Sequence, residues 1–385
     1  MGYNTRVHNL ILYLVIGTAL AFDFTNGFHD TANAMATSIA TGAFKPKTAV
    51  SVAAVLNLVG AFLSLSVAAT IASGIVTQDL VTLPVIFAGL AGAIIWNVST
   101  WYAGIPSSSS HALIGGVVGA MLVHAGSKAV TWSGVLSKVL VPAILAPLVA
   151  GLVAALATWF AFRMTKKVAD APKRRSFRWA QVGSASMVSL AHGTNDAQKT
   201  MGIITLALIA NGTLVKGGST PSWAVVACGI AISLGTYLGG WRIIRTLGKG
   251  LTDIDTPQGF AAETSSAVVI LASTHLGFPL STTQVCTGSV VGTGIGHHVP
   301  VRWGVFGRMC VAWLFTFPAA AIIGGLAFAG QNAIGGSLGV AILAVVLAAI
   351  CGGIYLLSRR NPVSPDNVND AWDPDVSEPT EQLAA

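Results

Sequence analysis

The chain has 385 residues, of which 53% are hydrophobic and 9% are charged, and its net charge is +7. Soluble domains carry about 25% charged residues, so this composition excludes a water-soluble fold. Apolar stretches of about 20 residues, each long enough to cross a membrane, recur along the chain. We predict an all-α, polytopic, multi-pass protein of the plasma membrane, in contact with membrane lipid. No basic patch is interleaved with aromatic residues, so no nucleic-acid partner is expected.

The predicted apolar segments lie, in chain order, at residues 10–44, 49–73, 82–103, 108–124, 133–162, 180–210, 223–244, 259–276, 283–296, 305–330 and 336–357. Polar residues interrupt the first and the sixth of them. The most basic loop, Lys166 to Arg178, separates the fifth segment from the sixth and is expected to be cytoplasmic. Counting outwards from this loop places the N-terminus outside and the C-terminus inside.

Two motifs occur twice in the same order. NGFHDTANAM, which begins at Asn26, matches HGTNDAQKTM, which begins at His192, at an offset of 166. GIPSSSSHALIGGVVG from Gly104 matches GFPLSTTQVCTGSVVG from Gly277 at an offset of 173. Together the matches indicate a duplicated unit of about 170 residues. Because the loop charges start the second copy on the opposite side, we predict inverted repeats.

Each repeat is predicted to contain a broken helix and a re-entrant hairpin. We expect Gly27 and Gly193 to loosen the helices at the polar clusters, and the hairpins to turn at Pro106 and Pro279. The predicted parts are a first transmembrane repeat (1–165), a basic cytoplasmic linker (166–179), a second, inverted repeat (180–335), an additional transmembrane helix (336–357) and a disordered acidic tail (358–385).

The polar clusters carry groups that are costly inside a membrane. An ionised aspartate at the bilayer centre costs about 2.5–3.5 kcal/mol on insertion scales, so these residues should face a cavity or one another. Carboxylates and amide oxygens together suit Na⁺, a hydrated divalent ion or a proton relay, whereas the alternative is a structural pair between two helices. The candidates for cation or proton coupling are Asp23, Asn26, His29, Asp30, Asn33, Asn195, Asp196, Gln198 and Lys199. Glu263 is either a proton carrier or a helix-pairing residue.

The hairpin turns favour an anion. Each reads Gly-x-Pro, then a run of hydroxyl residues, then a new helix, and the free N–H groups at a helix start bind anions. Two such starts that face each other would hold a small tetrahedral oxyanion. Ordinary N-capping is the alternative, but it uses only one hydroxyl. The candidate substrate-binding residues are Ser107, Ser108, Ser109, Ser110, Ser281, Thr282 and Thr283.

The segments GFHDTANA, HGTNDAQKTMG, PSSSSHALIG and PLSTTQVCTG resemble the inorganic phosphate transporter (PiT) family, over nearly all of residues 10–357. The resemblance implies a homodimeric secondary transporter that carries inorganic phosphate with a coupling cation. It implies that Asp30, Asn33, Asn195 and Asp196 lie near the cation and phosphate sites, and that the hairpin hydroxyls bind phosphate. Many members have Asn-Asp where this chain has His29-Asp30. That variant resembles the bacterial low-affinity, proton-coupled type, some of which carry a neutral metal–phosphate complex.

We therefore predict import of phosphate by symport and alternating access, with H⁺ as the coupling ion and Na⁺ as the alternative. No cofactor and no resident metal are assigned, and a divalent cation carried with phosphate is a further alternative. A sulfate or other oxyanion permease stays open, as does a channel. A serine hydrolase is disfavoured because there is no Gly-x-Ser-x-Gly elbow and the second hairpin lacks His111, so no enzyme activity is expected.

Overall fold

The computed structural model describes residues 3–370, and within that range it contains no β-strand beyond two isolated bridges. The α-helices are α1 (Tyr3–Ala40), α2 (Pro46–Gly60), α3 (Ser66–Gly74), α4 (Leu83–Tyr102), α5 (Ser109–Ala125), α6 (Trp132–Gly134), α7 (Val141–Met164), α8 (Asp170–Ala210), α9 (Ser222–Leu238), α10 (Trp241–Lys249), α11 (Thr256–His275), α12 (Thr282–Gly296), α13 (Trp303–Ile334) and α14 (Gly336–Ser358). Two short 3₁₀ helices (Gln78–Leu80 and Ser127–Ala129) and a π-helix (Val135–Leu140) complete the secondary structure. The predicted all-α fold is confirmed.

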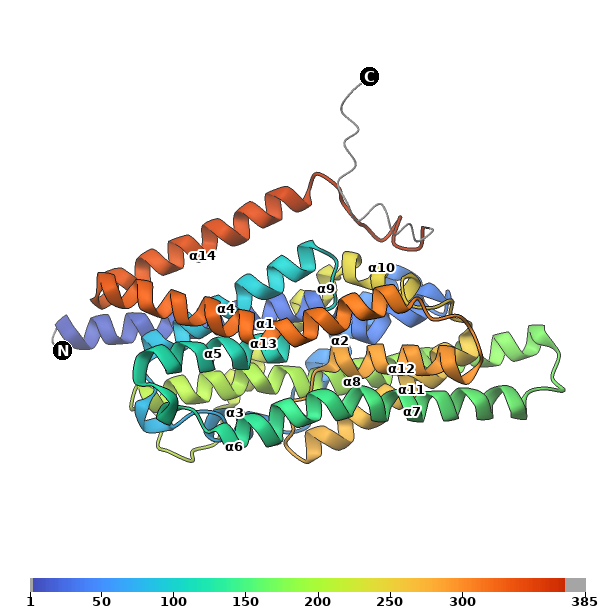
Figure 1. Ribbon diagram of the computed structural model, residues 1–385, viewed down its shortest axis with the longest axis horizontal. Helices are drawn as coiled ribbons and strands as arrows, with labels where there is room; N and C mark the ends of the chain where they lie inside the picture. Colours follow the sequence, from blue (N-terminus) through green and yellow to red (C-terminus); the bar gives the residue numbers. More distant parts are fainter. Residues whose placement is uncertain (1–2, 371–385) are drawn as a thin grey trace, which may run out of the picture.

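Several helices are built to cross a membrane. Within the part of the chain that the structure describes, five are long and apolar enough, and the bent pair α9 and α10 makes a sixth if it counts as one span. Large apolar side chains lie exposed along α7, α13 and α14, as expected of surfaces that face lipid. Figure 1 shows α14 along one edge of the bundle and α7 along the opposite edge. The chain is thus a multi-pass membrane protein.

The two polar clusters lie inside continuous helices. Both α1 and α8 stay helical through them, so the predicted loosening at Gly27 and Gly193 is wrong. The glycines instead allow close helix crossings: a Cβ at Gly27 would lie 2.3 Å from the Ile232 carbonyl oxygen of α9, and one at Gly193 would lie 2.3 Å from the Asn57 carbonyl oxygen of α2. The breaks fall in the partner helices. Residues 61–65 separate α2 from α3, and the chain bends by 68° between α9 and α10.

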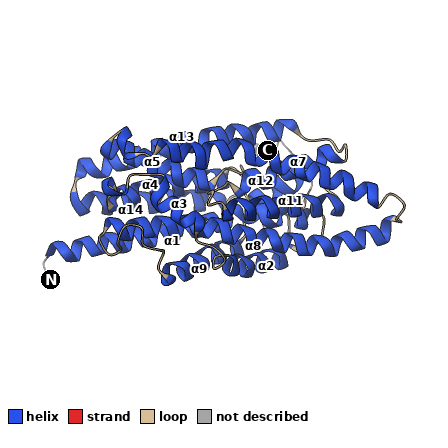
Figure 2. Cartoon of the chain, turned by 90° about the horizontal axis from the view of Figure 1, so that it is seen from below, coloured by secondary structure: helices blue, strands red, loops and turns tan. Residues whose placement is uncertain are grey.

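The two halves of the chain exchange packing partners. Helix α1 of the first half packs on α9, and α8 of the second half packs on α2. In the same way α5 packs on α13, and α12 packs on α7. Figures 1 and 2 show α1 and α8 side by side with opposite chain directions. This reciprocal arrangement supports the predicted inverted repeats.

The segment after α14 returns to the body of the protein, and we call residues 361–370 the C-terminal strap. Arg242 of α10 donates hydrogen bonds to the carbonyl oxygens of Ser358 and Asn361. Val368 of the strap is buried, and the Asn369 amide donates to the Ile39 carbonyl oxygen near the end of α1 at 3.3 Å. The strap lies within residues 358–385, the segment predicted to be a disordered tail. The rest of that tail, residues 371–385, lies outside the described residues. Most of the predicted linker is the first part of α8.

Candidate functional site

The candidate site lies where two helical hairpins meet between α1 and α8. The first hairpin (residues 83–125) consists of α4 and α5, and the second (residues 256–296) consists of α11 and α12. Their tips are in direct contact, because the Ser110 hydroxyl of the first donates to the Leu280 carbonyl oxygen of the second at 3.0 Å. The prediction that the two hydroxyl-rich tips come together is confirmed.

Asp30 of α1 joins both tips. Its side chain is buried, and one carboxylate oxygen lies 2.6 Å from Nδ1 of the neighbouring His29. The other oxygen accepts hydrogen bonds from the hydroxyls of Ser109 at 2.8 Å and Thr282 at 3.3 Å. Ser109 starts α5 and Thr282 starts α12, so this one carboxylate holds the beginnings of both hairpin helices.

Asp196 of α8 is the second buried carboxylate. Its Oδ1 forms an ion pair with Lys199 Nζ at 2.7 Å, and its Oδ2 accepts from the Asn26 amide at 3.3 Å and from the Thr282 hydroxyl at 3.4 Å. Lys199 Nζ also donates to the Ser110 hydroxyl and to the Leu280 carbonyl oxygen. The pair therefore ties α8 to both hairpin tips and places a positive charge between them.

His29 connects Asp30 to the first hairpin. Its Nε2 lies 3.2 Å from the Thr100 hydroxyl and 3.3 Å from the Ser107 hydroxyl, and those two hydroxyls are 2.7 Å apart. Ser107, His29 and Asp30 thus form a hydrogen-bonded line, which is also the order of groups in a serine hydrolase. Here the line ends in a hydroxyl that is already bonded to Thr100, so its effect is to fix the imidazole in the site.

Three asparagines bring amide groups to the site from α1 and α8. Asn33 donates to the hydroxyls of Thr283 at 3.0 Å and Thr282 at 3.2 Å, and Asn195 donates to the Thr274 hydroxyl at 2.7 Å. The side-chain oxygens of all three asparagines, which are Asn26, Asn33 and Asn195, are buried and have no hydrogen-bond partner among the described residues. Buried polar atoms are normally satisfied, and neutral oxygens such as these are typical cation ligands.

Four predicted site residues lie outside this central cluster or serve another purpose. Ser108 and Ser281 are the N-caps of α5 and α12, because each hydroxyl accepts from the backbone N–H three residues on. Gln198 points to the start of α3, where its Oε1 accepts from the Val67 N–H at 2.8 Å. It supplies a cap that the hydrophobic N-cap residue of α3 lacks. Asp23 is fully buried two turns before Asp30 on α1, and neither of its oxygens has a partner among the described residues.

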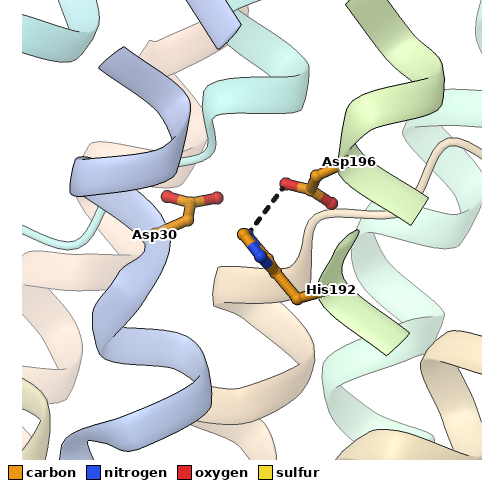
Figure 3. Close-up of side chains that lie close together, drawn as sticks. All are labelled: Asp30, His192 and Asp196. Atoms are coloured by element: carbon orange, nitrogen blue, oxygen red, sulfur yellow. Dashed lines mark ion pairs between the residues drawn. The ribbon is translucent and has the colours of Figure 1, made fainter. Parts of the chain in front are cut away.

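His192 is a site residue that the sequence did not single out. Figure 3 shows its ring directed toward Asp196, with Asp30 facing them from α1. His192 Nε2 lies 3.5 Å from Asp196 Oδ2, and Nδ1 lies 3.1 Å from Asn57 Oδ1. One ligand atom from each of Asp30, His192 and Asp196 lies within 4.8 Å of the others. A signal was present, because at the offset of 166 this histidine is the repeat mate of Asn26.

Hydroxyls at two helix starts, a buried lysine and two buried carboxylates, all inside a helical membrane protein, define a transporter of small anions. The model of the phosphate transporter family matches the chain twice, over residues 26–175 and 163–324. The chain belongs to this family, whose members are transporters and not enzymes, as predicted. Two successive matches also indicate an internal repeat.

Relatives and a solved structure agree with this assignment. A probable low-affinity inorganic phosphate transporter of Mycobacterium bovis is 58% identical over 365 residues, covering 94% of this chain and 88% of that protein. One of the same description from Bacillus subtilis is 43% identical, covering 83% of this chain and 96% of that protein. A solved structure described as the sodium-dependent phosphate transporter has a TM-score of 0.75 at 24% identity and covers 84% of this chain and 100% of its own. That likeness establishes the shared fold.

Proposed function

We propose that this chain imports inorganic phosphate by cation symport, with H⁺ as the coupling ion, through alternating access to the site between the hairpin tips. The observation that carries the proposal is the convergence of both tips on the carboxylates, with Thr282 within 3.4 Å of both Asp30 and Asp196. In alternating access, this one site would open to each side of the membrane in turn.

The chemistry of the site favours phosphate. The starts of α5 and α12 offer backbone N–H groups and hydroxyl donors, and Lys199 adds a buried positive charge. Carboxylates beside an anion site would repel sulfate, which has no proton to donate near neutral pH. Phosphate carries at least one proton there and can donate it in a hydrogen bond to Asp30 or Asp196. This observation disfavours the sulfate permease.

Coupling follows from charge. An anion placed beside two carboxylates needs a positive partner, because an unpaired charge in a membrane protein interior is costly. A proton can be taken up at His29 and Asp30, which are hydrogen-bonded to each other, and imidazole is the side chain suited to proton exchange near neutral pH. Asp23, which has no hydrogen-bond partner among residues 3–370, is a further place for a proton. Na⁺ is the alternative, and the solved structure with the same fold is that of a sodium-dependent transporter.

A second candidate is a divalent cation that travels with phosphate. Asp30, His192 and Asp196 come close enough to share one ion, and the free oxygens of the asparagines could complete its shell. The ion would then be part of the substrate. The homodimer stays a prediction from the family resemblance.

The test uses purified protein in liposomes with one gradient imposed at a time. We expect an inside-alkaline pH gradient to drive accumulation of labelled phosphate without Na⁺, and a 100-fold excess of sulfate to compete weakly. Asp30→Asn and Asp196→Asn should each abolish uptake, whereas Asp170→Asn, an exposed carboxylate at the start of α8, should not. Accumulation driven only by Na⁺, or only when a divalent cation is added, would replace the proton by that ion. Wild-type uptake by both site variants would refute the proposed site.

A further inference from the structure

Glu263 is a buried carboxyl group outside the central cluster. It lies on α11, in the first arm of the second hairpin, and is 2% exposed. Oε1 accepts hydrogen bonds from the Thr37 hydroxyl at 2.6 Å and the Gln181 amide at 3.0 Å, and Oε2 accepts from the Ser184 hydroxyl at 2.7 Å. No lysine or arginine forms an ion pair with it among the described residues. All of its partners are neutral.

Glu263 stands beside a polar stripe that runs along α1. Asp30, Asn33 and Thr37 are spaced by three or four residues, so they share one face of the helix, and Thr41 continues the spacing just past its end. At its Asp30 end, the stripe reaches the proposed phosphate site. At the other end, the Thr41 hydroxyl donates to Gln181 Oε1 at 2.8 Å, just after α1 ends at Ala40. The loop charges place this end at the cytoplasm.

A small cavity of about 10 Å³ lies between Glu263 and Asn33, one of the asparagines of the site. Its polar lining consists of Asn33, Thr37, Glu263, Ser266 and Cys286. Asn33 also holds the hydroxyls of Thr282 and Thr283 at the tip of the second hairpin. A void of this size has room for about one water molecule, which the polar half of its lining could hold; the other half is apolar and includes Leu247 and Val290. One water there would link Asn33 of the site to Glu263 by hydrogen bonds.

The contacts of Glu263 suit both of its charge states. An ionised carboxylate accepts from all three neighbours as they stand. A protonated one needs an acceptor for its O–H, and the hydroxyl of Thr37 or Ser184 provides one by rotating, since hydroxyls both donate and accept. Protonation therefore requires no movement of heavy atoms. A residue that only paired helices would gain nothing from this property.

The titratable groups around Glu263 come from the helices packed against α11. Helix α8, which supplies two of its hydrogen-bond donors, begins with the basic residues Lys173, Arg174, Arg175 and Arg178. Cys286 of α12 lines the same cavity, and Asp30 of α1 and Asp196 of α8 lie farther into the site. Helix α7, which also packs on α11, has Arg163 as its one charged residue, and that side chain is exposed. At the offset of 173, the repeat mate of Glu263 is Leu90, which is fully buried on α4. The first repeat thus has no carboxyl group at the position equivalent to Glu263, so this feature belongs only to the hairpin on the cytoplasmic side.

We propose that Glu263 is the group from which the co-transported proton leaves for the cytoplasm. Resting on the proposed proton symport, this assignment gives the proton a site separate from the phosphate site. In the inward-open state the His29–Asp30 pair gives up its proton, which passes to a Glu263 oxygen. The new O–H bond then breaks, and the proton leaves to cytoplasmic water near Thr41. Glu263 is then ionised again and can accept the proton of the next transport cycle.

The test compares net transport with exchange in liposomes that contain purified Glu263→Gln, which keeps the shape and loses the titratable group. We expect uptake driven by a pH gradient, and the proton influx read by a trapped pH dye, to fall at least 10-fold. Exchange of labelled for unlabelled phosphate at equal concentrations needs no proton release and should stay within about 2-fold of wild type. Glu263→Asp should restore part of the net uptake, and Asp170→Asn is the matched exposed control.

Three results would overturn the role assigned to Glu263. Normal net uptake and proton influx in Glu263→Gln would overturn the assignment and leave a helix-pairing residue. Loss of exchange together with net uptake, in protein that remains monodisperse, would overturn it too, because the group would then act in phosphate binding. Wild-type protein that accumulates phosphate without any proton influx would refute the proposed proton symport itself, and the assignment of Glu263 with it.

Discussion

The buried ion pair between Asp196 and Lys199 gives a sharp prediction about stability. Both side chains are at most 1% exposed, and the charged atoms are 2.7 Å apart. At an effective dielectric constant of about 20, the attraction is about 6 kcal/mol, most of which the cost of removing both charges from water offsets. Removing Lys199 leaves the Asp196 carboxylate buried without its lysine, with only His192 at 3.5 Å and two neutral donors beside it. Such changes cost about 3–5 kcal/mol.

Lys199→Met should therefore lower the free energy of unfolding by about 3–5 kcal/mol. It also removes the donor that holds the Ser110 hydroxyl and the Leu280 carbonyl oxygen. The double variant Asp196→Asn/Lys199→Met should recover most of this loss, because neither new side chain is charged. The measurement is unfolding of purified protein in mixed micelles at increasing fractions of denaturing detergent. Both variants should fail to transport phosphate.

Helix α8 contains its own control. Asp170 and Lys173 form a pair at the same spacing of three residues, with nitrogen and oxygen 3.3 Å apart, but Asp170 is 86% exposed. Asp170→Asn, which removes the exposed member of this pair, should cost less than about 1 kcal/mol, as exposed pairs do. A free energy of unfolding of Lys199→Met within about 1 kcal/mol of wild type, or a double variant no more stable than the single one, would refute the cost assigned to the unpaired charge.

Three further predictions follow from the packing and the site. Gly193→Ala places a Cβ against the backbone of α2 and should cost about 1–3 kcal/mol in the same unfolding measurement. In Gly183→Ala, on the same helix, the new Cβ meets nothing within 4 Å, so this control should not be destabilised. Equal effects of the two substitutions would contradict the close crossing of α8 and α2. Ser109→Ala removes a hydrogen bond to the Asp30 carboxylate and should raise the KM for phosphate about 10-fold. Substitution of the exposed Ser137 by alanine is the control. An unchanged KM in Ser109→Ala would show that Ser109 is not part of the phosphate site. Arg245 of α10 contacts Asn367 and Asp370 of the C-terminal strap. Deletion of residues 361–385 removes these contacts, so trypsin should cleave at Arg245 several-fold faster in inside-out vesicles. An unchanged rate would show that the strap does not cover α10.

The membrane fold, the repeat and most of the central cluster could be predicted because each has a strong local signal. A run of 20 apolar residues has few alternatives, and polar residues inside such runs are expensive enough to mark a site. The doubled motifs showed which residues come together. Asp30, Asp196, Ser109 and Thr282, from four separate helices, do meet in one hydrogen-bonded cluster.

What the sequence did not reveal depends on partners far along the chain. Glycine in an apolar segment is compatible with a loosened helix and with a close crossing, and only the position of α9 and α2 distinguishes them at Gly27 and Gly193. Gln198 was grouped with the site because it lies beside the motif, but its amide supports α3. Similarly, the donors around Glu263 come from Thr37, 226 residues earlier, and from α8.

The exchange of packing partners between the halves has a consequence for biosynthesis. Helix α5 packs on α13, which begins roughly 190 residues after α5 begins. At about 5–20 residues per second, the ribosome needs ~10–40 s to deliver that partner. During this interval the newly made hydroxyl-rich tip has neither α12 nor α13 beside it. The insertion machinery must therefore shelter a polar, half-inserted hairpin until the second half arrives, and a nascent chain stopped before Trp303 should be degraded.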